Sequence, residues 1–200
     1  MSREEELQYQ TPPTCDLLGL LLKNRRPTGA VNEVWPNLYI GDAVIAREKS
    51  LLVRMGITHV VNGADGPQHV DTGPLFYTDT GVLYHGVKAA DCKDFDLSPF
   101  FMETAEFIHN ALTQKGKVLV HCARGTSRSA ALVLAFLMIK ERLTLVEAVE
   151  AVCRHRNILP NVGFLNQLSQ LDSSLALRRR TRKHQGAERE TEEGDVKTLT

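Results

Sequence analysis

The sequence predicts a single α/β domain, with a central, mostly parallel sheet and helices on both faces. Short β-type runs alternate with longer helical patterns, which is typical of parallel strands joined by helical crossovers. In addition, residues 130–136 are apolar on nearly all sides of a helix, which indicates a helix buried against a sheet. At 200 residues the chain is long enough for one such core and two short tails.

Four strands are expected where β-branched and aromatic residues form short runs between turn signals. They cover residues 38–40, 58–61, 82–87 and 118–121. Residues 63–74 are rich in Gly, Asp and Pro, which indicates a loop. Ligands of parallel sheets bind at the carboxyl ends of strands. The end of the strand expected over residues 118–121 is therefore the expected place for a site.

Helices are expected where apolar residues recur at helical spacing, and several of these segments begin with a capping signal. Thr144 is followed three residues later by Glu147, which is the pattern of a capping box. Ser98 and Pro99 are expected as the N-cap and first residue of another helix, and Asn161 as the cap of the last one. The expected helices cover residues 15–23, 43–54, 99–114, 130–139, 145–155 and 162–175.

The chain is expected to divide into three parts. Residues 1–30 form a polar N-terminal extension with a short helix, residues 31–177 the domain, and residues 178–200 a charged, disordered tail. The tail combines the basic cluster RRRTRK, of nuclear-localisation type, with the acidic segment AERETEEGD. A solvated tail is the simplest interpretation of these charges.

The composition excludes several classes of function. Lys+Arg and Asp+Glu both number 24, so the formal net charge is zero. The charge balance therefore gives no indication of nucleic acid or a membrane as a partner. The longest apolar run, residues 130–139, is about half the length that a bilayer span needs, and the N-terminal residues contain no signal-peptide core. The cysteines and histidines show no metal-ligand spacing, so neither a metal nor a cofactor is expected. A reducing compartment, the cytoplasm and also the nucleus, suits the four cysteines.

The most informative segment reads HCARGTSRSA over residues 121–130. An apolar strand leads into a loop of small residues at a helix N-terminus, where backbone N–H groups and the helix dipole favour an anion. A cysteine at this place, Cys122, is favoured as a thiolate, and a thiolate is a nucleophile. Arg128 adds a planar fork that can grip two oxygens of a phosphate. The alternative is a buried structural cysteine, but the combined pattern favours attack on phosphorus.

This segment resembles the signature of the protein tyrosine phosphatase superfamily, a cysteine followed by five residues and an arginine. The pattern HC-x-x-G-x-S-R-S is similar to that of the small dual-specificity phosphatases in particular. Further similar stretches lie at residues 33–41, 56–62, 84–98 and 160–165. The resemblance covers about residues 31–175 and is greatest for atypical members without a kinase-docking domain, notably the muscle- and testis-expressed branch. It implies the phosphatase fold and hydrolysis through a phosphocysteine.

The loop and the resemblance together give each residue of the segment an expected role. Cys122 is the nucleophile, and Arg128 clamps the phosphate. In the family a hydroxyl at the position of Ser129 hydrogen-bonds the sulfur, although a plain first-turn helix serine is the alternative. His121 is expected to steady the loop rather than to act as a base. The residues expected to bind the phosphate oxygens, mainly through backbone N–H groups, are Ala123, Arg124, Gly125, Thr126, Ser127 and Arg128.

The leaving oxygen needs a proton, and three aspartates follow the third strand: Asp91, Asp94 and Asp96. The resemblance favours Asp91 as the acid, because Ala-x-Asp followed by Phe and Leu-Ser matches the acid loop of the family. Asp96 is interpreted as a helix-start carboxylate, and Asp94 as a solvated residue. Asn161 has two open roles, as a helix cap or as a residue that orients water or the acid loop.

The predicted function is a dual-specificity protein phosphatase that acts on phosphotyrosine and phosphoserine or phosphothreonine in intracellular signalling. One alternative is a phosphatase for a phosphoinositide or an RNA 5′ phosphate, for which Arg124 is the hint. Another is a non-catalytic phospho-binding module, which is disfavoured because Cys122, Arg128 and Asp91 are all present. The expected partners are phosphorylated proteins, with kinases among them and a homodimer left open.

Overall fold

The computed structural model describes residues 9–23, 25, 28–67 and 69–197. It contains a five-stranded sheet in the order β1-β2-β5-β3-β4. The strands are β1 Val31–Trp35, β2 Leu38–Gly41, β3 His59–Asn62, β4 Leu83–Gly86 and β5 Val118–His121. β1 and β2 run antiparallel, and all other neighbours in this sheet run parallel. The prediction of an α/β fold with a mostly parallel sheet is thereby confirmed.

β1 is a strand that the expected set of four did not contain. It pairs with β2 across a tight turn, in which Asn37 adopts a left-handed φ of 60°. Within β1 only Val34 is buried, because the strand lies at the edge of the sheet. A half-exposed edge strand has a weaker apolar pattern than the buried parallel strands, which explains why the prediction missed it.

β5 is the central strand, and it leads into the site. It lies between β2 and β3, and all of its residues are buried. Val118 and Val120 contribute to the core on one face of the sheet, and Leu119 contributes to the core on the other. His121 pairs in register with Gly41 of β2 and with Asn62 of β3. The carboxyl ends of these three strands therefore meet at one edge of the sheet.

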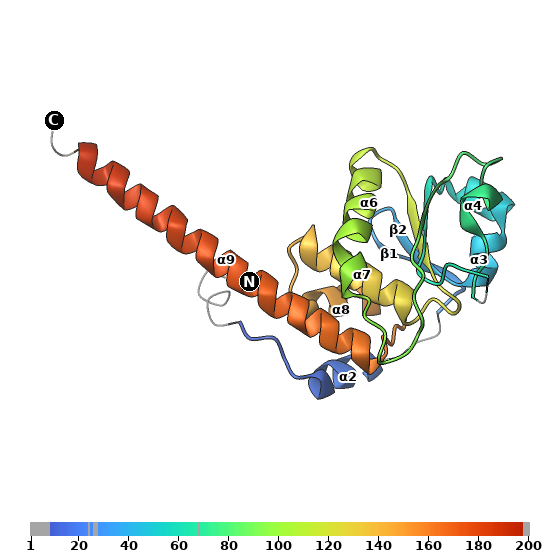
Figure 1. The fold of residues 1–200 in the computed structure, drawn as a ribbon, viewed down its shortest axis with the longest axis horizontal. Helices are drawn as coiled ribbons and strands as arrows, with labels where there is room; N and C mark the ends of the chain where they lie inside the picture. The colour runs from blue at the N-terminus through green and yellow to red at the C-terminus, as the bar shows by residue number, and fades with distance from the viewer. Residues whose placement is uncertain (1–8, 24, 26–27, 68, 198–200) are drawn as a thin grey trace.

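Helices cover both faces of the sheet, with α3 and α4 on one side and α6, α7 and α8 on the other (Figure 1). The predicted burial of α7 on all sides is confirmed, since residues 128–138 are all buried. The predicted capping box of Thr144 and Glu147 is present at the start of α8. The helices are α2 Thr14–Leu22, α3 Ala43–Arg47, α4 Lys49–Met55, α5 Gly73–Phe76, α6 Phe101–Thr113, α7 Arg128–Ile139, α8 Leu145–Cys153 and α9 Val162–Lys197.

One expected helix span and one expected helix start are wrong. The helix expected over residues 43–54 is divided at Glu48, whose ψ of 69° separates α3 from α4. Ser98 is not the N-cap of α6, because Ser98–Phe100 forms a 3₁₀ turn ahead of that helix. The Asp96 carboxylate instead accepts hydrogen bonds from the Ser98 N–H and hydroxyl at 3.1 and 2.6 Å. Asp96 is thus the capping side chain at this turn, which agrees with its interpretation as a helix-start carboxylate.

The last helix, α9, is much longer than expected. Its predicted end near Leu175 is wrong, because the structure continues the helix to Lys197 through charged residues that were expected to be disordered. Arg, Lys, Glu, Gln and Ala are good helix formers, so a charged composition does not itself end a helix. The division of the chain after residues 30 and 177 stays a prediction. Over the described residues, none of the helices has the length and apolar character needed to cross a bilayer.

Candidate active site

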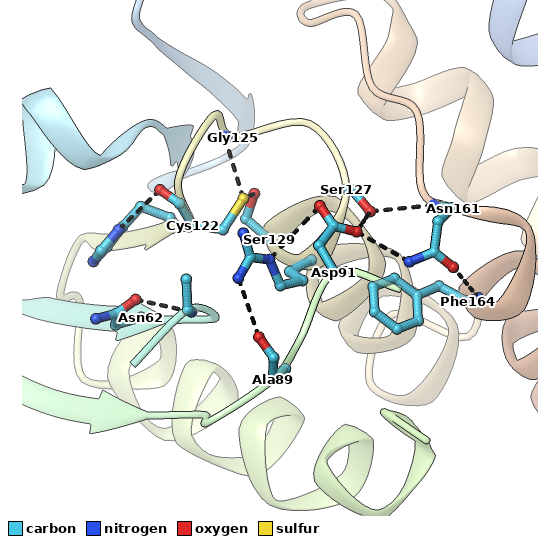
Figure 2. A network of polar contacts seen from close by, with 12 residues as sticks. Asn62, Ala89, Asp91, Cys122, Gly125, Ser127, Ser129, Asn161 and Phe164 are labelled. Atoms are coloured by element: carbon cyan, nitrogen blue, oxygen red, sulfur yellow. Dashed lines mark hydrogen bonds and ion pairs between the residues drawn. The ribbon is translucent and has the colours of Figure 1, made fainter. Parts of the chain in front are cut away.

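The loop over residues 122–127 connects β5 to α7 at the edge of the sheet where the strand ends meet. Cys122 follows directly after β5 and is 1% exposed. Its Sγ accepts a hydrogen bond from the Gly125 N–H at 3.2 Å and lies 3.3 Å from Ser129 Oγ (Figure 2). The loop therefore curls around the sulfur and brings the first turn of α7 against it.

Donors from other segments hold carbonyl groups of this loop on its outer side. The Ala43 N–H, at the start of α3, donates to the Ala123 carbonyl at 3.2 Å. The Leu159 N–H, in the segment between α8 and α9, donates to the Thr126 carbonyl at 2.8 Å. These two hydrogen bonds fix the course of the loop around Cys122.

Arg156 holds the middle of the loop, and the sequence analysis did not identify it. It is 4% exposed, and its Nε donates to the Gly125 carbonyl at 2.8 Å, while Nη2 donates to the Arg124 carbonyl at 3.5 Å. Its Nη1 donates to the Gly29 carbonyl at 2.8 Å and to Asn32 Oδ1 at 2.7 Å. No motif marks Arg156, because its loop partners lie 31 and 32 residues away in the chain. Arg156 fits a positioning residue for the loop.

The surroundings of Cys122 favour its thiolate. Burial alone would raise the pKa of the thiol, but hydrogen bonds from Ser129, the charge of Arg128 and the Gly125 N–H outweigh burial. The pKa of Cys122 therefore lies below its usual value. Cys153 is a contrast within the same chain, because burial raises the pKa of its thiol. The loop, and not burial itself, thus favours the nucleophilic form of Cys122.

We expect Ser129→Ala to move the ionisation of Cys122 to higher pH. The Ser129 hydroxyl stabilises the thiolate, so its removal leaves the effect of burial less compensated and raises the pKa of the thiol. The rate of alkylation by iodoacetamide, measured against pH, should have its midpoint at a higher pH than in the wild type. The acidic limb of kcat/KM should move in the same direction. An unchanged midpoint would show that this serine is only a first-turn helix residue.

Arg128 is the first residue of α7, and its guanidinium is buried at the site. It is 6% exposed, and its Nη1 donates to the Ala89 carbonyl at 3.1 Å. Its Nε has no hydrogen-bond partner among the described residues and lies 3.7 Å from Asp91 Oδ2. A buried N–H without an acceptor costs free energy, which an oxygen of an anionic ligand would offset. The geometry therefore leaves the Nε–H of the guanidinium available to a phosphate.

The structure separates the three candidate aspartates. The Asp91 carboxylate lies beside the loop, where its Oδ1 accepts hydrogen bonds from Ser127 Oγ at 2.6 Å and Asn161 Nδ2 at 3.0 Å (Figure 2). Asp94 is exposed, and Asp96 caps the turn before α6. Asp91 is thus held to the loop through the Ser127 hydroxyl, a contact that sequence reasoning missed because it assigned Ser127 only to phosphate binding.

Asn161 makes the contacts of both roles that the sequence left open. Its Oδ1 accepts a hydrogen bond from the Phe164 N–H at 3.0 Å, which caps the start of α9. Its Nδ2 donates to Asp91, and its backbone N–H donates to Ser127 Oγ at 3.1 Å. Asn161 therefore ties the start of α9 to Asp91 and to the loop over residues 122–127.

Three further residues of the segment are His121, directly before Cys122, and Ala123 and Arg124, directly after it. His121 is buried, with its Nδ1 3.4 Å from the Cys122 carbonyl oxygen. Burial lowers the pKa of His121 to about 4, so the ring is neutral at neutral pH. These contacts fit a residue that steadies the loop. Ala123 and Arg124 are exposed residues of the loop over residues 122–127.

Comparison with known proteins identifies the family. Residues 38–174 match the sequence family described as dual specificity phosphatase, catalytic domain. The chain belongs to this family. It is 53% identical over 169 residues to human dual specificity protein phosphatase 13B, in an alignment that covers 84% of this chain and 85% of the relative. The chain is therefore a cysteine-dependent protein phosphatase of dual specificity.

Two solved structures agree with this assignment. Human DUSP28 superposes with a TM-score of 0.65 at 30% identity, covering 74% of this chain and 97% of that one. A mouse putative dual specificity phosphatase, solved in complex with zinc tungstate, superposes with a TM-score of 0.66 at 32% identity, covering 79% and 96%. The predicted resemblance of this phosphatase to the small atypical members is thus confirmed.

Proposed function

We propose that this phosphatase hydrolyses phosphorylated side chains of intracellular proteins in two steps, with Cys122, Arg128, Asp91 and Ser129 as the catalytic residues. In the first step the Cys122 thiolate attacks phosphorus in line with the leaving oxygen, so that an S–P bond forms while the P–O bond breaks. The N–H groups of residues 123–128 and the Arg128 guanidinium hold the other phosphoryl oxygens. The depressed pKa of Cys122 supports this role, because the thiolate then exists without a separate base.

Asp91 supplies the proton that the leaving oxygen needs. The observation that carries this assignment is the pair of hydrogen bonds from Ser127 and Asn161, which hold the carboxyl group at the phosphate loop. The protonated Asp91 acts as the acid in the first step. Its carboxylate then takes a proton from the water that attacks the phosphocysteine in the second step.

The second step releases phosphate and regenerates the thiolate. Water attacks phosphorus, the S–P bond breaks, and the sulfur leaves as an anion. The Ser129 hydroxyl, 3.3 Å from Sγ, is placed to hydrogen-bond the developing negative charge. The same contact that lowers the pKa of the free thiol therefore also assists its departure.

Asp91→Asn should slow the release of the alcohol and should do so unequally for different substrates. Asparagine keeps the shape of the side chain but has no acidic proton, so we expect kcat/KM, which reports on the first step, to fall about 10²-fold for phenyl phosphate. The decrease should be much smaller for 4-nitrophenyl phosphate, whose leaving group departs without protonation. The measurement is kcat/KM for both esters at several pH values.

Asp94→Asn is the matched control for this experiment. Asp94 lies three residues further along the same loop and is exposed, so its replacement should leave the ratio of the two kcat/KM values unchanged. If Asp94→Asn changes that ratio and Asp91→Asn does not, the acid has been assigned to the wrong residue.

The substrate class can be tested by direct competition. We expect peptides carrying phosphotyrosine and phosphothreonine to be hydrolysed with kcat/KM at least about tenfold above that for a phosphoinositide or an RNA 5′ phosphate. Arg124 is an exposed residue of the phosphate-binding loop. Arg124→Ala should therefore change KM for acidic peptides more than kcat. If either non-protein substrate is hydrolysed faster than the peptides, and Arg124→Ala loses this activity, the substrate class has been assigned wrongly.

The partners that this function implies are phosphorylated proteins, and kinases are among the candidates.

We infer a cytoplasmic and also nuclear location, on the basis of the basic cluster RRRTRK and the free thiols. A homodimer also stays a proposal. Sedimentation of the purified chain tests the homodimer, and imaging of a tagged chain with and without the basic cluster tests the location.

A further inference from the structure

A segment that lies before the region matching the family is docked on the domain, and the mechanism above does not use it. We call residues 9–22, which include α2, the N-terminal strap. α2 packs against α8 and α9 (Figure 1). Leu17 and Leu21 of the strap are 1% and 2% exposed and belong to the main core. The strap is therefore an integral part of the packed structure.

The strap has a buried polar anchor in Asp172, a residue of α9 that is 1% exposed. Its Oδ2 accepts hydrogen bonds from the Tyr9 hydroxyl at 2.6 Å and from the Thr11 hydroxyl at 2.7 Å. Its Oδ1 accepts a hydrogen bond from the Leu145 N–H, at the start of α8, at 3.1 Å. A buried carboxylate is costly unless donors surround it. Because both hydroxyl donors come from the strap, strap docking and the burial of Asp172 depend on each other.

Strap docking is connected to the catalytic site through the segment between α8 and α9. This segment carries Arg156, Leu159 and Asn161, which hold the phosphate loop and Asp91. The strap contacts both of the helices that flank the segment. The chain that follows the strap also supplies the Gly29 carbonyl, which accepts a hydrogen bond from Arg156. Loss of docking is therefore expected to loosen residues that position the site.

The Tyr9 hydroxyl is the position in the strap where a modification would change docking most. Burial, together with the Asp172 carboxylate, raises the pKa of Tyr9, so the phenol keeps its proton and donates it. A phosphoryl group would replace this donor with acceptor oxygens and a charge of about −2. Two negative groups at hydrogen-bond distance, one of them the buried Asp172 carboxylate, repel strongly. Phosphorylated Tyr9 is thus incompatible with the docked position beside Asp172.

We propose that Tyr9 is a phosphorylation site and that its phosphorylation holds the strap undocked. A tyrosine kinase would transfer the γ-phosphoryl group of ATP to Tyr9 Oη, forming an O–P bond, releasing ADP and passing the phenol proton to the base of the kinase. A second copy of this phosphatase would reverse the modification, a step that rests on the proposed function. The state of Tyr9 would then couple strap docking to the position of the phosphate loop.

The first test measures docking without using activity. The Cys122→Ser full chain, which is unable to remove the phosphate, is incubated with a soluble tyrosine kinase domain and Mg-ATP, and phosphate is mapped by mass spectrometry. We expect phosphate on Tyr9 and amide hydrogen exchange of residues 9–22 that is about tenfold faster or more. Tyr9→Phe in the same background is the control, and its exchange should not respond to the kinase. Absence of phosphate on Tyr9, or unchanged exchange in the phosphorylated chain, overturns the proposal.

The second test measures the coupling to catalysis. A phosphonomethyl-phenylalanine at position 9, placed by ligation into the otherwise wild-type chain, mimics phosphotyrosine and resists hydrolysis. We expect kcat to fall about three- to tenfold, with a larger decrease for phenyl phosphate than for 4-nitrophenyl phosphate, because the hold of Asn161 on Asp91 is weakened. Tyr9→Phe should change kcat less, since it adds no charge. An unchanged kcat overturns the coupling, whereas an inactive unmodified chain contradicts the proposed function and not the switch.

Discussion

Cys122→Ser should lower kcat for both an aryl phosphate and a phosphopeptide by about 10⁴-fold or more. The loop lowers the pKa of a thiol, but the same donors do not ionise a serine hydroxyl at neutral pH. The substitution changes one atom in a side chain that is 1% exposed, so the fold and the phosphate-binding N–H groups should be retained. The expected result is a chain without turnover that still binds a phosphopeptide, measured by calorimetry.

Cys153→Ser provides the matched control. Cys153 is half-buried at the end of α8, and its thiol has its pKa raised by burial rather than lowered. Its replacement should leave kcat within about twofold of the wild type, because surface and partly buried substitutions outside a site have small effects. If kcat falls equally in Cys122→Ser and Cys153→Ser, either the nucleophile is another residue or both substitutions disturb folding.

The parts of this site that the sequence predicts are those whose signals are local. Cys122, Arg128 and Ser129 lie within one strand, one loop and one helical turn, so their spacing alone indicates that they share a site. The capping box of Thr144 and Glu147 is recognisable for the same reason, since both partners are three residues apart. In these cases the chain itself brings the groups together.

The parts that the sequence does not predict depend on contacts between distant segments. Arg156 reaches the Gly125 carbonyl from 31 residues away, and the Ser127 hydroxyl reaches Asp91 from 36 residues away. Asp172 is tied to Tyr9 across 163 residues. Arginine, serine and aspartate are ordinary surface residues in a sequence, so only the contacts between distant segments in the folded domain give them these roles. The division at Glu48 of the helix expected over residues 43–54 is likewise not predicted by the helix propensities of its residues.

The second large effect is expected at Gly125, where the loop requires the absence of a side chain. Gly125 has a φ of 68°, in the left-handed region that favours glycine. A Cβ at this position would lie 2.4 Å from the Gly41 carbonyl oxygen and 2.7 Å from Arg156 Nη2. Neither distance is sterically acceptable, so Gly125→Ala has to displace the loop from β2 or to displace Arg156.

Either displacement removes contacts on which the chemistry depends. The Gly125 N–H donates to Cys122 Sγ and its carbonyl accepts from Arg156, so a shifted loop raises the pKa of the thiol and misplaces the N–H groups around the phosphate. We expect kcat/KM to fall about 10³-fold and the free energy of unfolding to fall by about 2–4 kcal/mol.

Gly73→Ala separates the two causes, because Gly73 has a similar φ of 64° but open space around its Cβ. That variant should lose about 1 kcal/mol of stability from backbone strain and keep its activity. Steady-state kinetics and urea unfolding of both variants make the comparison. If Gly125→Ala behaves like Gly73→Ala, the close contact of the loop with β2 and Arg156 does not control the reactivity of Cys122.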